Sequence, residues 1–282
     1  MRFFGPRRIR VAIEQRRFQL RARRELEAEQ FVSTLLDRHP ELSGPGRLAP
    51  FEQRVFSQNG EDGVIAEIFR RIGTTNQAFV EFGCGNGIEN NTLYLLHRDW
   101  TGLWIDGDRR LVDTIRGSHR HLLERGALRV VASLVTAENI ESIFAANDVA
   151  AEPDLLSIDI DGNDYWVWQA IETYRPRVVV VEYNALWPAD ARWVQAYAPR
   201  QAWDGTSHHG ASLASLTALG EKKGYRLVHC TLAGVNAFFV RDDLAADHFA
   251  ADASPEAHYQ PARYHLASVV ARPRGLGDFE TV

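Results

Sequence analysis

From about residue 57 onward, short apolar runs alternate with segments in which apolar residues recur every three or four positions. The first pattern predicts buried strands, and the second predicts amphipathic helices. The runs predict strands at residues 78–82, 102–105, 128–132, 155–160 and 177–183. The segments between them predict helices at residues 61–71, 91–97, 109–125, 137–147 and 164–174, with Thr92 and Thr136 as expected caps. This alternation predicts a parallel sheet with helices on both faces.

The pattern changes after residue 209. A helix is expected at residues 210–223, and two apolar runs follow at 225–231 and 236–241. Strands this close in sequence must pair antiparallel, because a parallel crossover needs about a dozen residues or more. Five parallel strands closed by a hairpin resemble the layout of class I methyltransferases. We therefore expect a Rossmann-like α/β fold with a mostly parallel seven-stranded sheet, a C-terminal antiparallel hairpin and helices on both faces.

Composition divides the chain into three parts. Residues 1–50 form an Arg-rich helical extension, residues 51–245 form the α/β domain, and residues 246–282 form a polar, alanine-rich tail. Nine arginines fall in the first 24 residues and three glutamates follow, which predicts a long charged helix ending near residues 44–46. A solvated arm and an oligomerisation helix are both open as its role. Contact with an anionic membrane surface is less favoured, because its apolar face is poor.

Charge and cysteine content narrow the class of protein. The chain has 282 residues and a net charge of −5, which does not favour a nucleic-acid partner. It has only two cysteines, Cys84 and Cys230, so a disulfide framework is not expected and a reducing cytoplasm fits. The apolar runs are too short to cross a bilayer, and no apolar segment typical of a secretory signal follows the basic N-terminus. We expect a cytoplasmic protein, with peripheral membrane contact as the open alternative.

A glycine-rich loop, Glu-Phe-Gly-Cys-Gly-Asn-Gly, follows the first predicted strand. Gly83, Gly85 and Gly87 would let a ligand approach the backbone closely. The spacing lacks the third glycine of a dinucleotide fingerprint. Glu81 precedes the loop, and its carboxylate would accept hydrogen bonds from a ligand ammonium but repel a pyrophosphate. These features favour S-adenosylmethionine over a dinucleotide, with a plain strand–helix turn as the alternative.

Asp106 ends the second predicted strand, 23 positions after Gly83. A carboxylate at this edge, about 20 residues beyond a glycine loop, accepts hydrogen bonds from the ribose hydroxyls of a nucleoside. A helix N-cap is the alternative role, which Asp108 also suits. Residues 132–134 are expected near the adenine. The loop and Asp106 together are the strongest functional signal in the sequence.

Acidic residues gather where the fourth and fifth predicted strands end. Asp159 and Asp161 lie two residues apart, so in an extended chain their side chains point the same way. Glu182 and Asn184 end the neighbouring strand at the same edge. This oxygen-rich set suits Mg²⁺ or a similar hard cation, which could hold a diol and lower the pKa of one hydroxyl. The alternative is that Asp164 caps the next helix, while the two aspartates bind the cofactor and the backbone.

Residues 185–209 are a long connection, typical of a substrate lid. The lid contains four aromatic residues that could stack on a sugar ring or only pack the lid onto the domain: Trp187, Trp193, Tyr197 and Trp203. His208 and His209 follow them. A neutral His209 could take a proton from a substrate hydroxyl, and with Asp161 it forms the expected catalytic pair. Substrate binding and a plain exposed loop are the alternatives for both histidines.

Five stretches of the chain belong together: residues 57–63 (Ser-Gln-Asn-Gly-Glu-Asp-Gly), 81–87, 91–94, 157–166 and 180–184. In combination they resemble the FkbM-type branch of class I methyltransferases, over roughly residues 55–241. The resemblance implies methyl transfer to a hydroxyl, often of a sugar, polysaccharide or other secondary metabolite. It adds Asn91 to the cofactor-binding residues and places Gln58 and Glu61 near the cofactor's amino-acid end. Asp161 stands where relatives often have Glu, which changes the reach of the side chain but not its charge.

The leading hypothesis is an S-adenosylmethionine-dependent O-methyltransferase that acts on a glycan or another small-molecule hydroxyl, with Mg²⁺ as an optional aid. An NAD-dependent oxidoreductase is the second hypothesis, which Glu81 and the terminal hairpin disfavour. A non-catalytic binding protein on a methyltransferase-like fold is the third. The expected partners are the acceptor and, through the N-terminal helix, a second copy of the chain.

Overall fold

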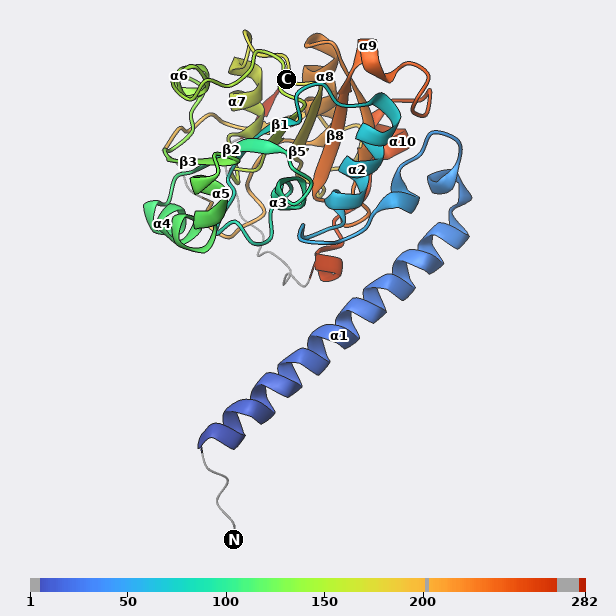
Figure 1. The fold of residues 1–282 in the computed structure, drawn as a ribbon. Coiled ribbons are helices and arrows are strands. Elements are labelled where there is room, and N and C mark those ends of the chain that lie inside the picture. Colours follow the sequence, from blue (N-terminus) through green and yellow to red (C-terminus); the bar gives the residue numbers. More distant parts are fainter. Residues whose placement is uncertain (1–5, 201–202, 268–278) are drawn as a thin grey trace.

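The computed structural model describes residues 6–200, 203–267 and 279–282. A seven-stranded sheet forms the centre of the domain (Figure 1). Its strands are β1 (Ala78–Phe82), β2 (Thr101–Asp106), β3 (Leu128–Ala132), β4 (Leu155–Ile158), β5 (Val178–Glu182), β7 (Tyr225–Cys230) and β8 (Asn236–Arg241). The order is β3-β2-β1-β4-β5-β8-β7. Strands β1 to β5 are parallel, and β8 is antiparallel to β5 and β7, which confirms the predicted sheet and terminal hairpin.

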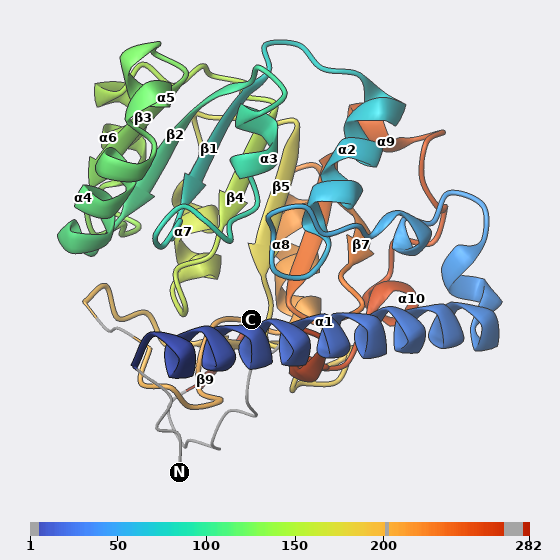
Figure 2. The ribbon, with the colours of Figure 1, turned by 60° about the horizontal axis from the view of Figure 1, so that its bottom comes forward.

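Helices cover both faces of the sheet, as predicted (Figure 2). One face carries α2 (Glu61–Ile72), α3 (Leu93–Leu96), α4 (Arg109–Ser118) and α5 (Arg120–Glu124). The other carries α6 (Ile140–Ala146), α7 (Asp164–Ala170) and α8 (Leu213–Lys222). Along β5, Val178 and Val180 pack on the first face and Val179 and Val181 on the second, because successive side chains of a strand alternate. Burial on both faces explains the continuous valine run.

Some predicted boundaries are wrong, because local contacts that leave no periodic signal decide them. The helix expected at residues 109–125 is two helices that meet at His119. The helix expected at residues 137–147 begins at Ile140, with Asn139 and not Thr136 in the N-cap position.

The strand expected at residues 155–160 ends at Ile158. Beyond it the backbone turns, because the Asp164 carboxylate accepts hydrogen bonds from the N–H groups of Ile160 and Gly162, both at 2.8 Å. Asp164 therefore holds the turn ahead of α7, instead of capping the helix as the alternative prediction had it.

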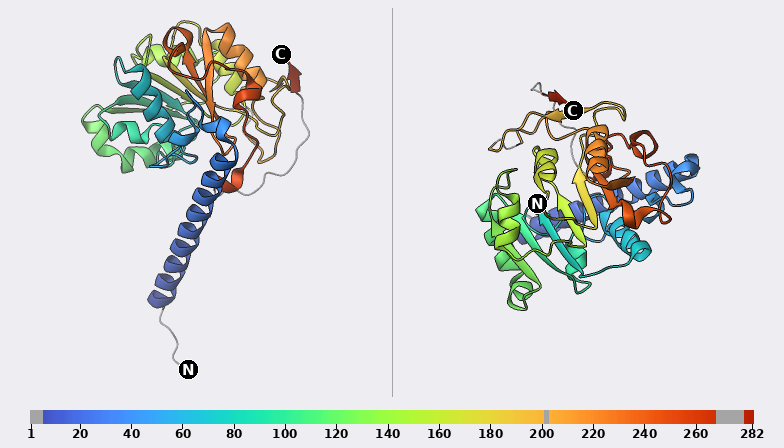
Figure 3. Two further views of the ribbon diagram at one scale, coloured as in Figure 1. Left: turned by 90° about the vertical axis from the view of Figure 1, so that its right-hand side faces the viewer. Right: turned by 90° about the horizontal axis from the view of Figure 1, so that it is seen from above.

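Helix α1 (Pro6–Arg38) projects away from the domain as one long rod (Figures 1 and 3). It ends earlier than predicted, and two short 3-10 helices, η1 (Pro40–Ser43) and η2 (Ala49–Phe51), lead to the domain. Among the α1 side chains that the structure describes, four apolar ones are 40% to 53% exposed: Ile13, Leu20, Leu26 and Phe31. Among the helices that the structure describes, none has the length and apolarity to cross a membrane.

The tail packs back onto the domain. It follows α9 (Asp242–Ala245) and contains α10 (Pro255–His258), η3 (Tyr264–Ala267) and β9 (Phe279–Thr281). Phe249 joins the core on the α2 face, and Arg47 donates a hydrogen bond to the carbonyl of Ala257 at 3.0 Å. Strand β9 pairs antiparallel with β6 (Trp193–Gln195), which lies in the predicted lid. A segment with little sequence pattern thus contacts both the N-terminal linker and the lid.

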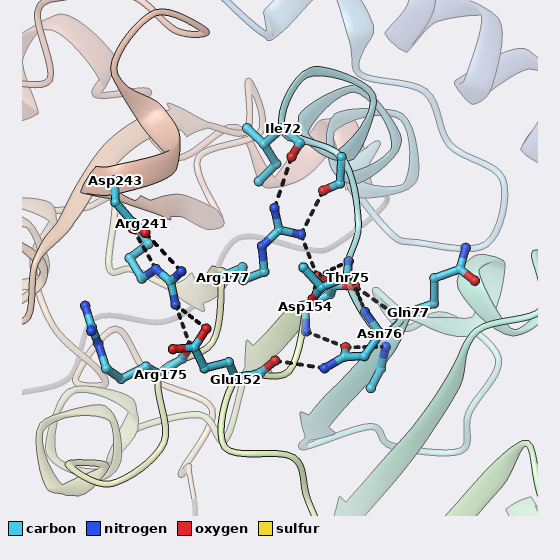
Figure 4. A network of polar contacts seen from close by, with 12 residues as sticks. Ile72, Thr75, Asn76, Gln77, Glu152, Asp154, Arg175, Arg177, Arg241 and Asp243 are labelled. Carbon is cyan, nitrogen blue, oxygen red and sulfur yellow. Dashed lines mark hydrogen bonds and ion pairs between the residues drawn. The ribbon is translucent and has the colours of Figure 1, made fainter.

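A buried ion pair fastens the amino-terminal edge of the sheet (Figure 4). Asp154 accepts hydrogen bonds from Arg177 at 2.7 Å and from the N–H groups of Thr75 and Gln77 at 2.9 and 2.7 Å. Arg177 also donates to the carbonyl of Gly73 at 2.8 Å. Burial alone would raise the pKa of Asp154, but these hydrogen bonds outweigh it and lower the pKa. The pair joins β4 and β5 to the turn ahead of β1 and leaves the opposite edge open for a site.

Candidate functional site

A cavity of about 530 Å³ lies at the carboxyl ends of the parallel strands. Parallel α/β sheets bind their ligands at this edge. Six of the residues predicted for the site line the cavity: Gly83, Gly85, Asp106, Asp159, Asp161 and Glu182. Residues 133–135, which overlap the segment expected near the adenine, line it as well. The structure therefore brings together the loop, the ribose acid and the acidic rim.

Five other predicted residues are described by the structure but do not line this cavity: Glu81, Gly87, Asn91, Asn184 and His209. Their expected contacts with cofactor, metal or substrate stay predictions.

The three loop glycines have different surroundings. Gly83 has φ +76°, and a side chain there would collide with the carbonyl oxygen of Asp159. This close approach lets β4 continue beside β1, since the Asp159 N–H donates to the carbonyl of Phe82 at 3.2 Å. Gly87 packs beneath the ring of Trp104. Gly85 faces open space in the cavity, and its N–H donates to Asp106 at 2.9 Å.

Glu81 is buried and holds the segment that follows the loop. Its carboxylate accepts hydrogen bonds from the Asn90 side chain at 2.6 Å, the Asn91 N–H at 2.8 Å and the Thr92 hydroxyl at 2.5 Å. Burial raises its pKa, and these hydrogen bonds partly offset that effect. Thr92 occupies the N-cap position of α3, but its hydroxyl donates to Glu81 and makes no capping hydrogen bond, so the predicted capping contact is absent.

Asp106 ends β2 and joins two turns. Its carboxylate accepts from the Gly85 N–H at 2.9 Å and the Asp108 N–H at 2.8 Å. Burial raises the pKa of Asp106, and the hydrogen bonds from the two N–H groups offset only part of that increase. Asp108 takes the N-cap of α4, where it accepts from the Arg110 N–H at 2.8 Å. The two acids thus divide the roles considered from sequence: Asp108 caps the helix, and Asp106 lines the cavity.

The acidic rim is compact. Carboxylate oxygens of Asp159, Asp161 and Glu182 lie within 4.8 Å of one another. Their convergence arises from a turn and not from an extended strand, because Asp161 has φ +55° in the loop held by Asp164. Burial, followed by the charges of Glu182 and Asp161, raises the pKa of Asp159 well above its usual range. A set of oxygen donors of this kind fits a hard divalent cation, which would relieve the repulsion.

Asn184 and His209 support the rim from behind. The Asn184 amide donates to the carbonyls of Ser207 and His209 at 3.0 and 2.9 Å, so it anchors the end of the lid. His209 is buried, and its Nδ1 lies 3.8 Å from a carboxylate oxygen of Glu182. Its ring centroid lies 6.3 Å from that of Trp203, which does line the cavity.

The lid aromatic residues have separate roles. Trp187 and Trp193 pack on each other with ring centroids 4.0 Å apart. The Tyr197 hydroxyl donates to Glu138 at 2.7 Å and accepts from the Ala137 N–H at 3.0 Å, which ties the lid to the turn ahead of α6. Of the four predicted aromatic residues, Trp203 is the one in the cavity wall.

Sequence reasoning assigned no role to several lining residues, among them Asn59, Asn163 and Tyr264. Asn59 lies in the motif at residues 57–63, where Gln58 and Glu61 were expected at the cofactor. Gln58 does line the cavity, but Glu61 is fully buried. The sequence does offer one signal for Asn59, because it lies between Gln58 and Glu61 in this motif. Tyr264 comes from the tail, where the sequence holds no signal.

A second cavity, of about 510 Å³, lies near the C-terminal ends of α7 and α8. Its polar lining includes Lys223, which donates to the carbonyls of Gln169 and Ile171 at 3.1 and 2.6 Å. Lysine side chains near helix ends commonly bond such carbonyls, so the position of Lys223 in this cavity has a structural explanation.

No protein-family model matches the sequence, and no significant match exists among curated protein sequences. Several solved structures are similar. Magnesium protoporphyrin IX methyltransferase from Synechocystis PCC 6803 with bound SAM is 14% identical, with a TM-score of 0.43, over 77% of this chain and 96% of that one. The methyltransferase domain of bacterial CtHen1-C is 14% identical, with a TM-score of 0.42, over 65% and 97%.

A third similar structure is an S-adenosylmethionine-dependent methyltransferase from Clostridium acetobutylicum. It is 11% identical, with a TM-score of 0.41, over 63% of this chain and 89% of that one. Likenesses this distant are no guide to activity. The strand order, with five parallel strands and β8 inserted antiparallel between β5 and β7, is itself that of the class I methyltransferase fold.

Proposed function

We propose that this chain is an S-adenosylmethionine-dependent O-methyltransferase. One observation carries the proposal: a single cavity at the carboxyl edge joins the glycine loop, Asp106 and three clustered carboxylates. The carboxylates also weigh against a dinucleotide cofactor, because they would repel a pyrophosphate placed beside the loop. They would attract the ammonium and sulfonium groups of S-adenosylmethionine.

The cofactor assignments follow from the cavity wall. Gly83 and Gly85 would let the cofactor lie against the backbone, and Asp106 would accept from its ribose hydroxyls. Leu134 and its neighbours would contact the adenine. Glu81 and Asn91 would act as positioning residues, since they hydrogen-bond to each other behind the loop.

The acceptor side is proposed to be the acidic rim. Asp159, Asp161 and Glu182 would hold a Mg²⁺ ion, and Asn184, the fourth ligand expected from the sequence, would steady the adjoining lid residues. A bound cation would lower the pKa of an acceptor hydroxyl and orient a diol. Such an acceptor, a glycan or a related polyol, agrees with the FkbM-type resemblance. His209 would act on the reaction through Glu182, which it approaches from outside the cavity.

Asp161 provides the test. The variant Asp161→Ala is expected to weaken Mn²⁺ binding, followed by electron paramagnetic resonance, by at least about tenfold. It should also abolish methyl transfer from labelled S-adenosylmethionine to a panel of glycans. S-adenosylhomocysteine affinity, measured by calorimetry, should change little, because Asp161 is the exposed member of the rim.

Asp113→Ala is the matched control, because Asp113 is an exposed acid on α4. Full activity of Asp161→Ala would refute the rim assignment. Failure of the unaltered protein to bind S-adenosylhomocysteine would refute the cofactor itself, and tight NAD binding would replace it with an oxidoreductase. If activity survives EDTA and does not respond to added Mg²⁺, the proposed role of the metal is refuted, while the methyltransferase proposal stands.

We also propose that α1 mediates self-association. Residues 6–24 contain eight arginines and one glutamate, whereas residues 25–38 contain four acids and one arginine. Two copies paired antiparallel would place each basic half against an acidic half. The apolar residues Ile13, Leu20 and Phe31 are 7 and 11 positions apart, which puts them on one stripe of the helix between the two copies.

A further inference from the structure

The segment ahead of α2 is held by the first two residues of that helix. We call residues 53–60 the strap. One carboxylate oxygen of Asp62 accepts from the N–H groups of Val55, Phe56 and Ser57 at 2.7 to 2.8 Å, and from the Ser57 hydroxyl at 2.8 Å. Four donors on one oxygen leave the strap backbone little freedom. The strap therefore presents its next residues to the cavity in a fixed position.

Glu61 fixes the side chains in the same way. Its carboxylate accepts from the Asn59 N–H at 2.7 Å and from the Asn59 side-chain amide at 3.0 Å. It also accepts from the side-chain amide of Asn236 at 2.8 Å. Reversing either amide would turn a carbonyl oxygen toward the carboxylate, so the hydrogen bonds determine the orientation of both asparagines.

This orientation leaves two acceptors unused. The carbonyl oxygens of Asn59 and Asn236 are buried and have no hydrogen-bond partner. Asn59 is 7% exposed and lines the cavity, and its amide group is held by Glu61, so its oxygen is directed away from Glu61. A buried carbonyl without a donor is unfavourable, and a ligand that supplies an N–H or O–H would remove that cost.

The surroundings specify which donor fits. Asp159 and Glu182 line the same cavity, and Asn236 is the register partner of Glu182 across β5 and β8. Carboxylates and amide oxygens together favour a positively charged donor over a neutral hydroxyl. No basic side chain is among the residues described as lining the cavity.

We propose that the carbonyl oxygen of Asn59 accepts a hydrogen bond from the ammonium group at the amino-acid end of S-adenosylmethionine. Glu61 is the positioning residue that aims this oxygen. The inference rests on the proposed cofactor and adds a residue that recognises one chemical group of it. Discrimination follows, because a site built to accept from an ammonium binds an analogue without it poorly.

Three ligands distinguish the contribution of the amino group from that of the carboxylate. They are S-adenosylhomocysteine, its analogue without the amino group and its analogue without the carboxylate. Calorimetry in EDTA excludes a metal. Asn59→Ala should weaken S-adenosylhomocysteine and the amine-bearing analogue by roughly tenfold to a hundredfold, the range for a hydrogen bond to a charged group. The deaminated analogue should bind both proteins equally within about twofold.

Glu61→Gln supplies a second variant, since it frees the Asn59 amide to reverse. Like Asn59→Ala, it should weaken only the two ligands that carry the amino group, but by a smaller factor. A merely structural role of Glu61 would weaken all three ligands alike. Asn147→Ala is the matched control, because Asn147 donates to the carbonyl of Ile143 at the end of α6 and should leave all three affinities unchanged.

Equal weakening of all three ligands by Asn59→Ala would overturn the proposal, as would unchanged binding of S-adenosylhomocysteine. Selective loss of the carboxylate-bearing ligands would reassign Asn59 to the other group and also refute it. If the unaltered protein binds none of the three, the proposed cofactor fails instead, which is a different result.

Discussion

Gly83 and Gly85 are two residues apart in one loop, yet their surroundings differ completely. Both have positive φ, +76° and +59°. A side chain at position 83 would meet the backbone of Asp159, whereas one at position 85 would meet no atom within 4 Å. The first glycine is required for β1 and β4 to lie side by side, whereas packing in the structure does not require the second, which is needed for its own left-handed conformation.

Substitution of each glycine by alanine should therefore give unequal losses. Gly85→Ala should lower the free energy of unfolding by about 1–2 kcal/mol, the cost of a left-handed conformation for a residue with a side chain. Gly83→Ala adds a backbone collision and should cost several times more. Urea denaturation followed by circular dichroism measures both, and equal losses would contradict the packing described here.

At the scale of elements, periodicity predicted the seven strands and their parallel or antiparallel sense. Most of these runs are apolar because both of their faces are buried, with the edge strand β3 as the exception. The short 232–235 connection permits only a hairpin. The ends of elements were less predictable. Ile158 ends β4 because Asp164 bonds back to the loop, a contact that depends on folding and not on the pattern of apolar positions.

The candidate site was predictable to a similar extent. Gly83, Asp106 and Glu182 were found from sequence, because the ends of parallel strands share one edge. Asn59 and Tyr264 were not, because the strap and the tail reach the cavity through tertiary packing. Glu81 was expected from the sequence to contact the cofactor, but in the structure its carboxylate holds the segment that follows the loop.

The ion pair of Asp154 and Arg177 should be a major stabilising contact between elements (Figure 4). Asp154→Asn leaves Arg177 buried without its counter-charge and should cost about 3–5 kcal/mol in urea denaturation. Because folding lowers the Asp154 pKa, its contribution is present above the unfolded-state pKa and is lost as the pH falls. The difference in free energy of unfolding between the unaltered protein and Asp154→Asn should therefore become smaller at acid pH.

Asp113→Asn is the control for this measurement. Asp113 pairs with Arg116 at 3.2 Å on the surface of α4, and exposed pairs contribute about 0–1 kcal/mol. A loss for Asp154→Asn no larger than that of the control would show that the buried pair does not fasten the sheet.

At the scale of the whole molecule, two parts differ sharply in character. The α/β domain buries its apolar residues in two clusters, one on each face of the sheet. Helix α1 stands apart from both and carries opposite charge on its two halves (Figure 3). Such a helix gains little from its own domain, so a second copy is the partner that its charge pattern favours.

Self-association can be tested in the full chain. Leu20→Gln alters the apolar stripe shared with Ile13 and should shift the protein toward monomer in sedimentation equilibrium. Leu26→Gln is a matched control, because Leu26 lies six positions on and faces the other side of the helix. Added salt should also favour monomer by screening the charged halves. A monomeric unaltered protein, or equal effects of both substitutions, would contradict antiparallel pairing.

The pairing of β9 with β6 has a practical consequence for anyone who handles this protein. Thr281 is opposite Trp193, so any sequence joined after Val282 starts beside the lid of the cavity. An affinity tag or fluorescent fusion at that end would compete with the strand or hold residues 185–209 in place. Binding assays on such material would then report the tag as well as the protein. A tag ahead of α1 avoids the lid, although it would sit on the helix proposed to pair.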